Sequence, residues 1–108
     1  ANGDVANKIG TLGLALLARA QGAQFMVVAP STTVDMQLPI GRDIPIESRD
    51  AREIWAATGT AAPPAAVSVH NPAFDITPAA LVDALVTEHG VIEKPDVAGM
   101  AACLANVR

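Results

Sequence analysis

The spacing of hydrophobic and polar residues predicts a helix followed by a strand in the first third of the chain. Over residues 5–20, apolar side chains recur at helical spacing, and further leucines and alanines occupy the remaining faces. This segment is therefore predicted to be a helix buried on several sides. Residues 25–29 form a continuous apolar run that ends at Pro30, which is typical of a central parallel strand covered on both faces.

The rest of the chain alternates in the same way. Residues 35–49 are rich in proline, glycine and aspartate, which predicts an irregular excursion. Asp50 followed by Glu53 resembles a capping box and predicts a short helix. Residues 66–69 are expected to form a second short strand. The alternation predicts an α/β fold.

Two capping signals predict helices near the C-terminus. Thr77, followed by proline, is a strong helix start, and the predicted helix continues to about Glu88. Asp96 is expected to cap a final helix of small residues. Cys103 in that helix is expected to pack as a small buried hydrophobe.

Composition and charge exclude several classes of protein. Of the 108 residues, 51% are hydrophobic and 17% are charged, and the longest apolar stretches are interrupted well before the ~20 residues that a membrane span needs. The net charge is -4 and the basic residues are scattered, so neither a membrane nor a nucleic acid is an expected partner. The single cysteine cannot form an intrachain disulfide, and no zinc-like cluster is visible, which favours a reducing cytoplasm.

The first residues place polar chemistry at the predicted start of a helix. Asp4 follows the flexible Gly3 and is a suitable N-cap, which puts Asn7 and Lys8 in the first turn. A lysine is unfavourable beside the partial positive charge of a helix N-terminus unless an anion also binds there. A phosphate would receive hydrogen bonds from the free N–H groups, from Asn7 and from Lys8. The alternative is that Asp4 only caps the helix and that Lys8 extends into solvent.

Other polar positions are expected to be mainly structural. Residues 31–33 follow the carboxyl end of the predicted strand, the ligand side of an open α/β sheet, but turn formation and capping are their expected role. The two histidines have no partner carboxylate or metal-ligand spacing. Asp75 either accepts hydrogen bonds from the helix predicted to start at Thr77 or braces an active site from outside, and the sequence leaves both open.

Four motifs are similar to segments of one enzyme family. Residues 2–11, Asn-Gly-Asp-Val-Ala-Asn-Lys-Ile-Gly-Thr, resemble the NGDxANKIGT segment of 5-methylthioribose-1-phosphate isomerases, which are related to regulatory subunits of eukaryotic initiation factor 2B. Three further segments match in family order: Ala-Pro-Ser-Thr-Thr-Val-Asp at 29–35, Ile-Pro-Ile-Glu at 44–47 and Asn-Pro-Ala-Phe-Asp-Ile-Thr-Pro at 71–78. The resemblance extends to about Val91.

The resemblance implies a Rossmann-like parallel-sheet domain, of which residues 1–108 would form the C-terminal portion. It implies an aldose–ketose isomerase that converts methylthioribose 1-phosphate to methylthioribulose 1-phosphate with no metal or organic cofactor. The family's catalytic cysteine and aspartate would precede residue 1, so Cys103 and Asp4 do not take those roles, and this chain alone would be inactive. The family's Asn-Lys pair, which binds substrate, corresponds to Asn7 and Lys8. The expected partners are the N-terminal part of the enzyme and a second copy in a homodimer.

Two alternatives stay open from the sequence. A sister family that isomerises ribose 1,5-bisphosphate shares the Asn-Lys-Ile-Gly-Thr core, but residues 29–32 differ from the Glu-Thr-Tyr-Lys-type sequence that it tends to carry. A non-catalytic regulatory subunit of the initiation factor 2B type generally lacks the combination of the Asn-Gly-Asp and Asn-Pro-Ala-Phe-Asp motifs. The motifs therefore favour the methylthioribose 1-phosphate isomerase.

Overall fold

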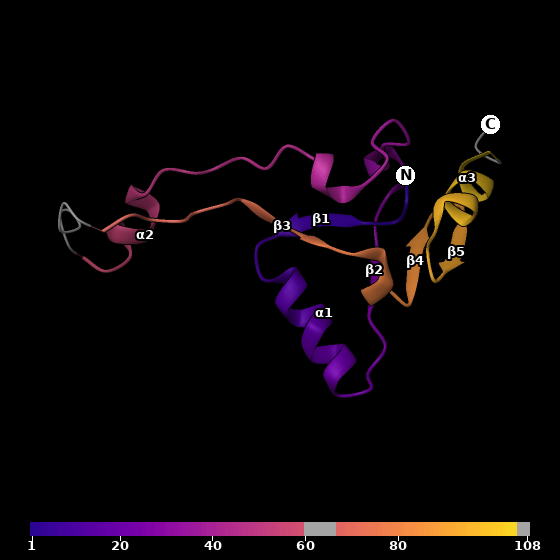
Figure 1. Ribbon diagram of the computed structural model, residues 1–108, viewed down its shortest axis with the longest axis horizontal. Coiled ribbons are helices and arrows are strands. Elements are labelled where there is room, and N and C mark those ends of the chain that lie inside the picture. The colour runs from indigo at the N-terminus through magenta and orange to yellow at the C-terminus, as the bar shows by residue number, and fades with distance from the viewer. Residues whose placement is uncertain (60–66, 106–108) are drawn as a thin grey trace.

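The computed structural model describes residues 1–59 and 67–105. Short strands and helices alternate through these ranges (Figure 1). The strands are β1 (Val5–Lys8), β2 (Met26–Val28), β3 (Phe74–Thr77), β4 (Ala84–Thr87) and β5 (Gly90–Glu93). The helices are α1 (Thr11–Ala20), α2 (Arg52–Ala56) and α3 (Val97–Ala105), and single 3₁₀ turns span Ser31–Thr33, Gly41–Asp43 and Ala79–Leu81.

The strands form two small sheets. β1 and β3 pair antiparallel, in a register that puts Asn7 directly opposite Asp75. In the other sheet β4 is central, parallel to β2 and antiparallel to β5 (Figure 1). The described residues therefore form a mixed α/β fold with mixed strand directions, which confirms the predicted α/β class.

The core of the three-stranded sheet lies against α3. Its buried apolar side chains are Leu85, Ile92 and Met100. Cys103 is partly buried against this cluster, close to the role predicted for it. Asp96 accepts the N–H of Gly99 at 2.7 Å, so it caps α3 as predicted.

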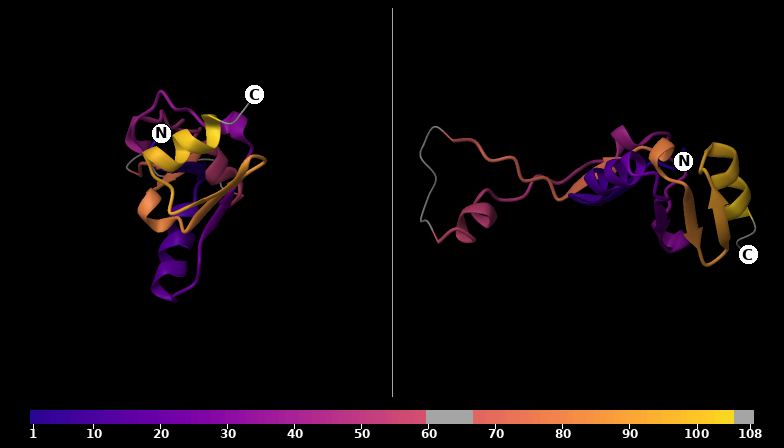
Figure 2. Two further views of the ribbon diagram at one scale, coloured as in Figure 1. Left: turned by 90° about the vertical axis from the view of Figure 1, so that its right-hand side faces the viewer. Right: turned by 90° about the horizontal axis from the view of Figure 1, so that it is seen from below.

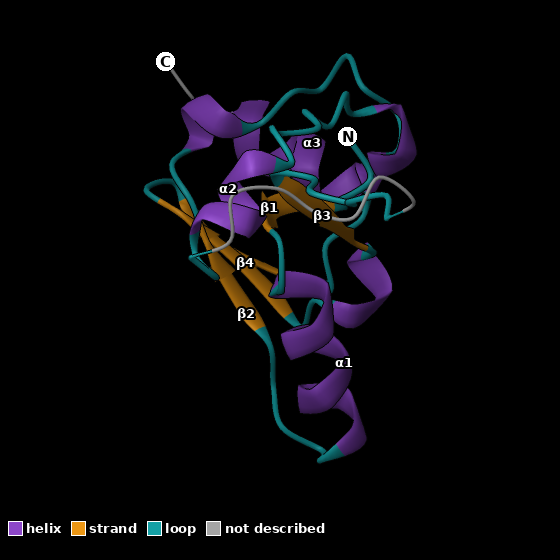
Figure 3. Cartoon of the chain, turned by 90° about the vertical axis from the view of Figure 1, so that its left-hand side faces the viewer, coloured by secondary structure: helices purple, strands orange, loops and turns teal. Residues whose placement is uncertain are grey.

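The single helix predicted over residues 5–20 is wrong in its first half. β1 occupies residues Val5–Lys8, and the helix begins only at Thr11 (Figure 3). The backbone N–H and C=O groups of β1 form hydrogen bonds with β3, so they do not need partners within a helix. Gly10, with φ at 109°, then makes the turn into α1 in a conformation that favours glycine.

α1 is also more exposed than its apolar sequence predicts. Ala15 is its one buried residue, whereas Leu14 and Leu17 are 60% and 63% exposed. The helix ends in a Schellman motif, in which the N–H groups of Gly22 and Ala23 bond back to the last turn. α1 therefore presents an apolar face that no other described residue covers.

The helix predicted over residues 77–88 is wrong. Thr77 ends β3, a single 3₁₀ turn follows, and Ala84–Thr87 form β4. The Ala-Leu-Val-Thr sequence of β4 is compatible with a strand, and its backbone pairs with β2 on one side and β5 on the other. Pairing with β2 and β5 therefore prevails over the Thr-Pro sequence, which predicts a helix start at Thr77. The strand predicted at 66–69 is also not found, since residues 67–69 are irregular and residue 66 lies outside the described residues.

The strand predicted over residues 25–29 is confirmed as β2, but its surroundings differ from the prediction. Within the described residues, β2 pairs only with β4. Met26 and Val28 on β2 are 60% and 78% exposed. β2 is therefore an edge strand with an exposed apolar face, rather than a central strand covered on both faces.

α2 lies on an arm that extends away from both sheets (Figure 2). The outgoing and returning segments of the arm run side by side, and a bridge between Ser48 and Pro72 joins them. The short helix predicted after Asp50 is confirmed. The capping box is not formed, because the Glu53 carboxylate pairs with Arg49 at 2.6 Å instead.

Candidate substrate site

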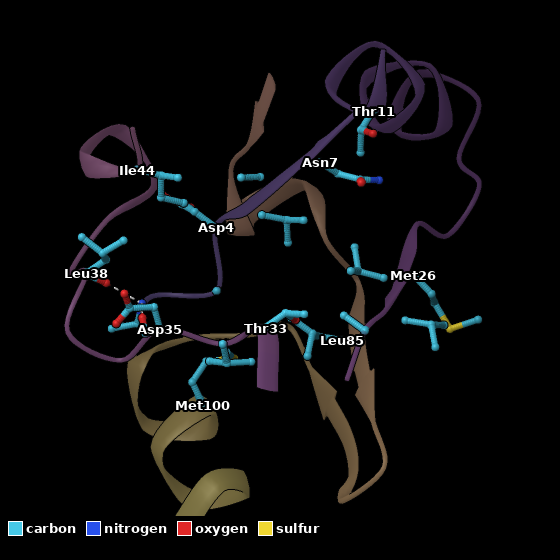
Figure 4. A pocket seen from close by; sticks show the side chains of 18 of the residues that line it. Asp4, Asn7, Thr11, Met26, Thr33, Asp35, Leu38, Ile44, Leu85 and Met100 are labelled. Carbon is cyan, nitrogen blue, oxygen red and sulfur yellow. Dashed lines mark hydrogen bonds between the residues drawn. The ribbon is translucent and has the colours of Figure 1, made fainter. Parts of the chain in front are cut away.

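A cavity of about 590 Å³ lies where the two sheets meet. β1, the start of α1, β2 and the irregular segment 33–44 form its wall, and Met100 of α3 lies at one end (Figure 4). Most lining side chains are apolar, and the polar ones are Asp4, Asn7, Thr11, Thr33 and Asp35. A mostly apolar cavity with a few polar groups is typical of sites that bind small molecules.

Asn7 is the sequence-predicted site residue that lines this cavity. Figure 4 shows Asn7 on β1 and Thr11 at the start of α1 along the same part of the wall. No hydrogen bond or ion pair with another described residue engages the Asn7 amide. The amide is therefore available to a ligand in the cavity.

Lys8 does not converge with Asn7 in the predicted way. The two residues occupy consecutive positions of β1, and consecutive side chains on a strand point to opposite faces. Lys8 is exposed and is absent from the cavity wall. The expectation that both side chains lie in the first turn of a helix is therefore wrong. Among the described residues the Lys8 ammonium forms no ion pair within 4 Å, but its charge, after the hydrogen bonds from Arg49, contributes to the lowered pKa of Glu53.

Asp4 joins three segments instead of capping α1. Its carboxylate accepts the N–H groups of Gly41 and Ala79, each at 2.8 Å. Burial opposes ionisation, but the donors from Ala79, Asn2 and Gly41 outweigh it and hold the pKa of Asp4 below its usual range. A Cβ at Gly41 would lie 2.6 Å from Ile76 and 2.7 Å from Asp4, so only glycine fits this approach.

Asp75, and not Asp4 as predicted, caps the start of α1. Its carboxylate accepts the N–H of Gly10 at 2.7 Å and the N–H of Leu12 at 3.1 Å. Asp75 therefore does bind free N–H groups at a helix start, but the helix is α1 and not the one predicted after Thr77. The Thr11 hydroxyl donates to the Lys8 carbonyl at 2.8 Å and closes the same turn.

This cap changes where a phosphate can bind. The start of α1 already holds the negative charge of Asp75, and two of its N–H groups are taken. A phosphate at the same place would lose those donors and meet a like charge. The start of α1 is therefore a poor phosphate site in this structure.

Ser31 and Glu88 form a further contact that the sequence did not predict. The Glu88 carboxylate accepts the Ser31 hydroxyl at 2.5 Å and the Ser31 N–H at 2.8 Å, and these bonds lower the pKa of Glu88 to about 2. The two residues are 57 positions apart, and the parallel pairing of β2 with β4 brings them together. Residues Ser31–Thr33 form a 3₁₀ turn, in agreement with their predicted turn-forming role.

Metal-ligand geometry is not found in the described ranges. Among residues 1–59 and 67–105, no three His, Cys, Asp or Glu side chains are grouped so that they could hold a metal ion. The structure also contains, over these same residues, no helix that is long and apolar enough to cross a membrane.

Comparisons with known proteins agree with the motifs. Methylthioribose-1-phosphate isomerase of Marinobacter nauticus is 58% identical over 102 residues, which cover 94% of this chain and 29% of that protein. The enzyme of the same name from Pseudomonas paraeruginosa is 56% identical over 108 residues, which cover 100% of this chain and 30% of that protein. This chain thus spans about 30% of the length of the curated relatives that it matches.

Solved structures share the fold. A crystal structure of 5-methylthioribose 1-phosphate isomerase from Pyrococcus horikoshii matches with a TM-score of 0.88 and 44% identity, over 97% of this chain and 29% of that one. The delta subunit of translation initiation factor eIF-2B from A. fulgidus matches with a TM-score of 0.83 and 37% identity, over 94% and 30% of the two chains. The family model described as the initiation factor 2 subunit family matches residues 1–94. The chain belongs to the initiation factor 2 subunit family.

Proposed function

We propose that this chain is part of an aldose–ketose isomerase that converts 5-methylthioribose 1-phosphate to 5-methylthioribulose 1-phosphate in methionine salvage. Relatives at 56–58% identity carry the name of this enzyme. The observation that carries the proposal is the position of Asn7, because the Asn-Lys motif typical of these isomerases places a free amide on the wall of the cavity.

Asn7 and Lys8 bind the phosphate of the substrate in this proposal. Asn7 supplies a directional donor from the cavity wall. Lys8 lies next to it at the end of β1 and would have to bring its long, flexible side chain round to the phosphate as a point charge. The phosphate stays on the substrate throughout the reaction. Binding it therefore anchors and orients the sugar and does not by itself favour the transition state.

The transfer of hydrogen between C1 and C2 of the sugar is assigned to residues outside this chain. A cysteine and an aspartate in the rest of a longer polypeptide would act there, with no metal or organic cofactor. Asp4 is a poor general base because two backbone N–H groups engage its carboxylate. Cys103 lies at the core, with its sulfur 3.8 Å from the Thr87 hydroxyl.

The longer polypeptide would also complete the fold. We infer that residues 1–108 are the C-terminal portion of a Rossmann-like domain, in which further strands pair with the open edge of β2. The open edge of β2, which pairs only with β4 among the described residues, supports this inference, because a strand edge with unpaired N–H and C=O groups is normally covered. The complete enzyme would act in the cytoplasm as a homodimer.

The function is tested by incubating the full-length protein with 5-methylthioribose 1-phosphate or with ribose 1,5-bisphosphate and identifying the products by NMR. We expect the ketose from the first substrate and none from the second. Conversion of ribose 1,5-bisphosphate alone would assign the protein to the sister reaction. Conversion of neither would contradict an isomerase and favour a regulatory subunit like the eIF-2B protein whose fold it shares.

A further inference from the structure

The turn between β1 and α1 is fixed from outside by one side chain. Asp75 on β3 lies directly opposite Asn7 in the antiparallel pair, and its two oxygens accept the N–H groups of Gly10 and Leu12. Residues opposite each other in such a pair lie on the same face, typically with Cβ atoms ~5 Å apart. The Asp75 carboxylate therefore links the end of β1 to the start of α1 from the strand position opposite Asn7.

The position of Asn7 depends on this turn. The Asn7 amide makes no hydrogen bond of its own with another described residue, so its place on the cavity wall follows from the backbone of β1 and of the turn. Gly10 has φ at 109°, and a Cβ added there would meet no atom within 4 Å, so neighbouring side chains do not hold it in place. The two bonds to Asp75 and the bond from the Thr11 hydroxyl to the Lys8 carbonyl therefore close the turn.

We propose that Asp75 is a positioning residue for the sugar-phosphate site: it closes the β1–α1 turn and so sets where Asn7 meets the substrate. This inference rests on the proposed function. Asp75 itself does not touch the phosphate, because its charge would repel it. It excludes the phosphate from the start of α1 and leaves the cavity side of Asn7 as the binding position.

The test compares three variants of the full-length enzyme in steady-state kinetics with 5-methylthioribose 1-phosphate. Asp75→Ala removes both acceptors, and Asp75→Asn keeps one acceptor oxygen in the same shape. Asp96→Ala is the matched control, because Asp96 caps α3 through one N–H bond of 2.7 Å to Gly99. Amide exchange at Gly10 and Leu12 reports whether the turn has opened.

We expect Asp75→Ala to lower kcat/KM by about 10- to 100-fold, mainly through KM, and to speed exchange at the turn. Asp75→Asn should recover part of this loss, and the pH profile of kcat should keep its shape in both variants. Asp96→Ala should lower the melting temperature without a change in KM.

Two results would overturn the inference while leaving the function intact. The first is an Asp75→Ala enzyme with wild-type KM, which would make Asp75 an ordinary cap like Asp96. The second is an equal loss of kcat in Asp75→Ala and Asp75→Asn with one limb of the pH profile missing, which would make Asp75 a general base. A wild-type protein with no isomerase activity would instead overturn the proposed function, and this inference with it.

Discussion

At the scale of single residues, carboxylates hold distant parts of this chain together by accepting backbone N–H groups. Asp4 binds two separate segments, Asp75 binds the start of α1, and Glu88 binds Ser31. Hydrogen bonds to a charged acceptor are short and stronger than neutral ones. Such bonds let a short chain with few buried side chains hold together segments that are far apart in the sequence.

The first prediction concerns the phosphate ligands. Asn7→Ala, Lys8→Ala and the double variant of the full-length enzyme should each bind 5-methylthioribose 1-phosphate more weakly in calorimetry. For Lys8→Ala the expected loss is about 1.5–3 kcal/mol, the range for hydrogen bonds to charged groups. If both side chains bind one phosphate, the losses of binding free energy in the two single variants should not add up to the loss in the double variant.

Lys94→Ala, which removes the other lysine, is the control and should bind like wild type. Unchanged affinity in Asn7→Ala would remove Asn7 from the site.

The second prediction concerns pH. The bonds from Ser31 lower the pKa of Glu88 from 4.5 to about 2, so the folded state favours the charged form of Glu88. This contribution to stability is fully present above about pH 4.5 and is lost as the pH falls towards 2. Melting temperatures of the wild type and of Glu88→Gln should therefore differ at pH 6 and converge at pH 2. A difference that stays constant over this range would show that ionisation of Glu88 does not matter.

At the scale of elements, the sequence predicts the helices and strands that local patterns specify. It misses the strands whose conformation depends on pairing with other strands. β2 and α3 were found because a continuous apolar run and an N-cap at Asp96 are local patterns. The local pattern predicts helix at β1 and β4 because each is only four residues long and pairs with a strand far away in the sequence, β1 with β3 and β4 with β2, although β4 also pairs with the nearby β5. The motif singles out Asn7, which lines the cavity, but does not predict the strand that carries it.

The third prediction tests the break between β1 and α1. Gly10→Ala should destabilise the full-length protein by about 1–2 kcal/mol, since a side chain at positive φ is strained. Gly13→Ala is the matched control inside α1, where no described atom lies within 4 Å of the added Cβ, and it should be neutral or stabilising by up to about 1 kcal/mol. Urea unfolding measures both. An equal effect at the two glycines would indicate that residues 5–20 are helical throughout, as the periodicity alone predicts.

At the scale of the whole molecule, the described residues leave a large apolar surface exposed to solvent. Leu14 and Leu17 on α1, together with Met26 and Val28 on β2, are each at least 60% exposed. Soluble proteins rarely leave such faces open. A chain that spans about 30% of its relatives is expected to bury these faces against the rest of a longer polypeptide or against a second copy.

The fourth prediction is that the full-length enzyme is a homodimer. An obligate contact of this kind would bury upwards of ~2,000 Å² and should persist at nanomolar concentration. Sedimentation velocity over a dilution series is the measurement. A fully active monomer at micromolar concentration would contradict the dimer and leave the rest of the polypeptide to cover the apolar faces.

A crystal structure of the full-length protein with 5-methylthioribulose 1-phosphate bound would show directly whether Asn7 holds the phosphate. We expect a phosphate oxygen about 2.7–3.2 Å from the Asn7 amide nitrogen, inside the cavity, with Asp75 still bonded to the N–H groups of Gly10 and Leu12. A phosphate seated on the start of α1, with Asp75 displaced and Asn7 out of contact, would contradict it.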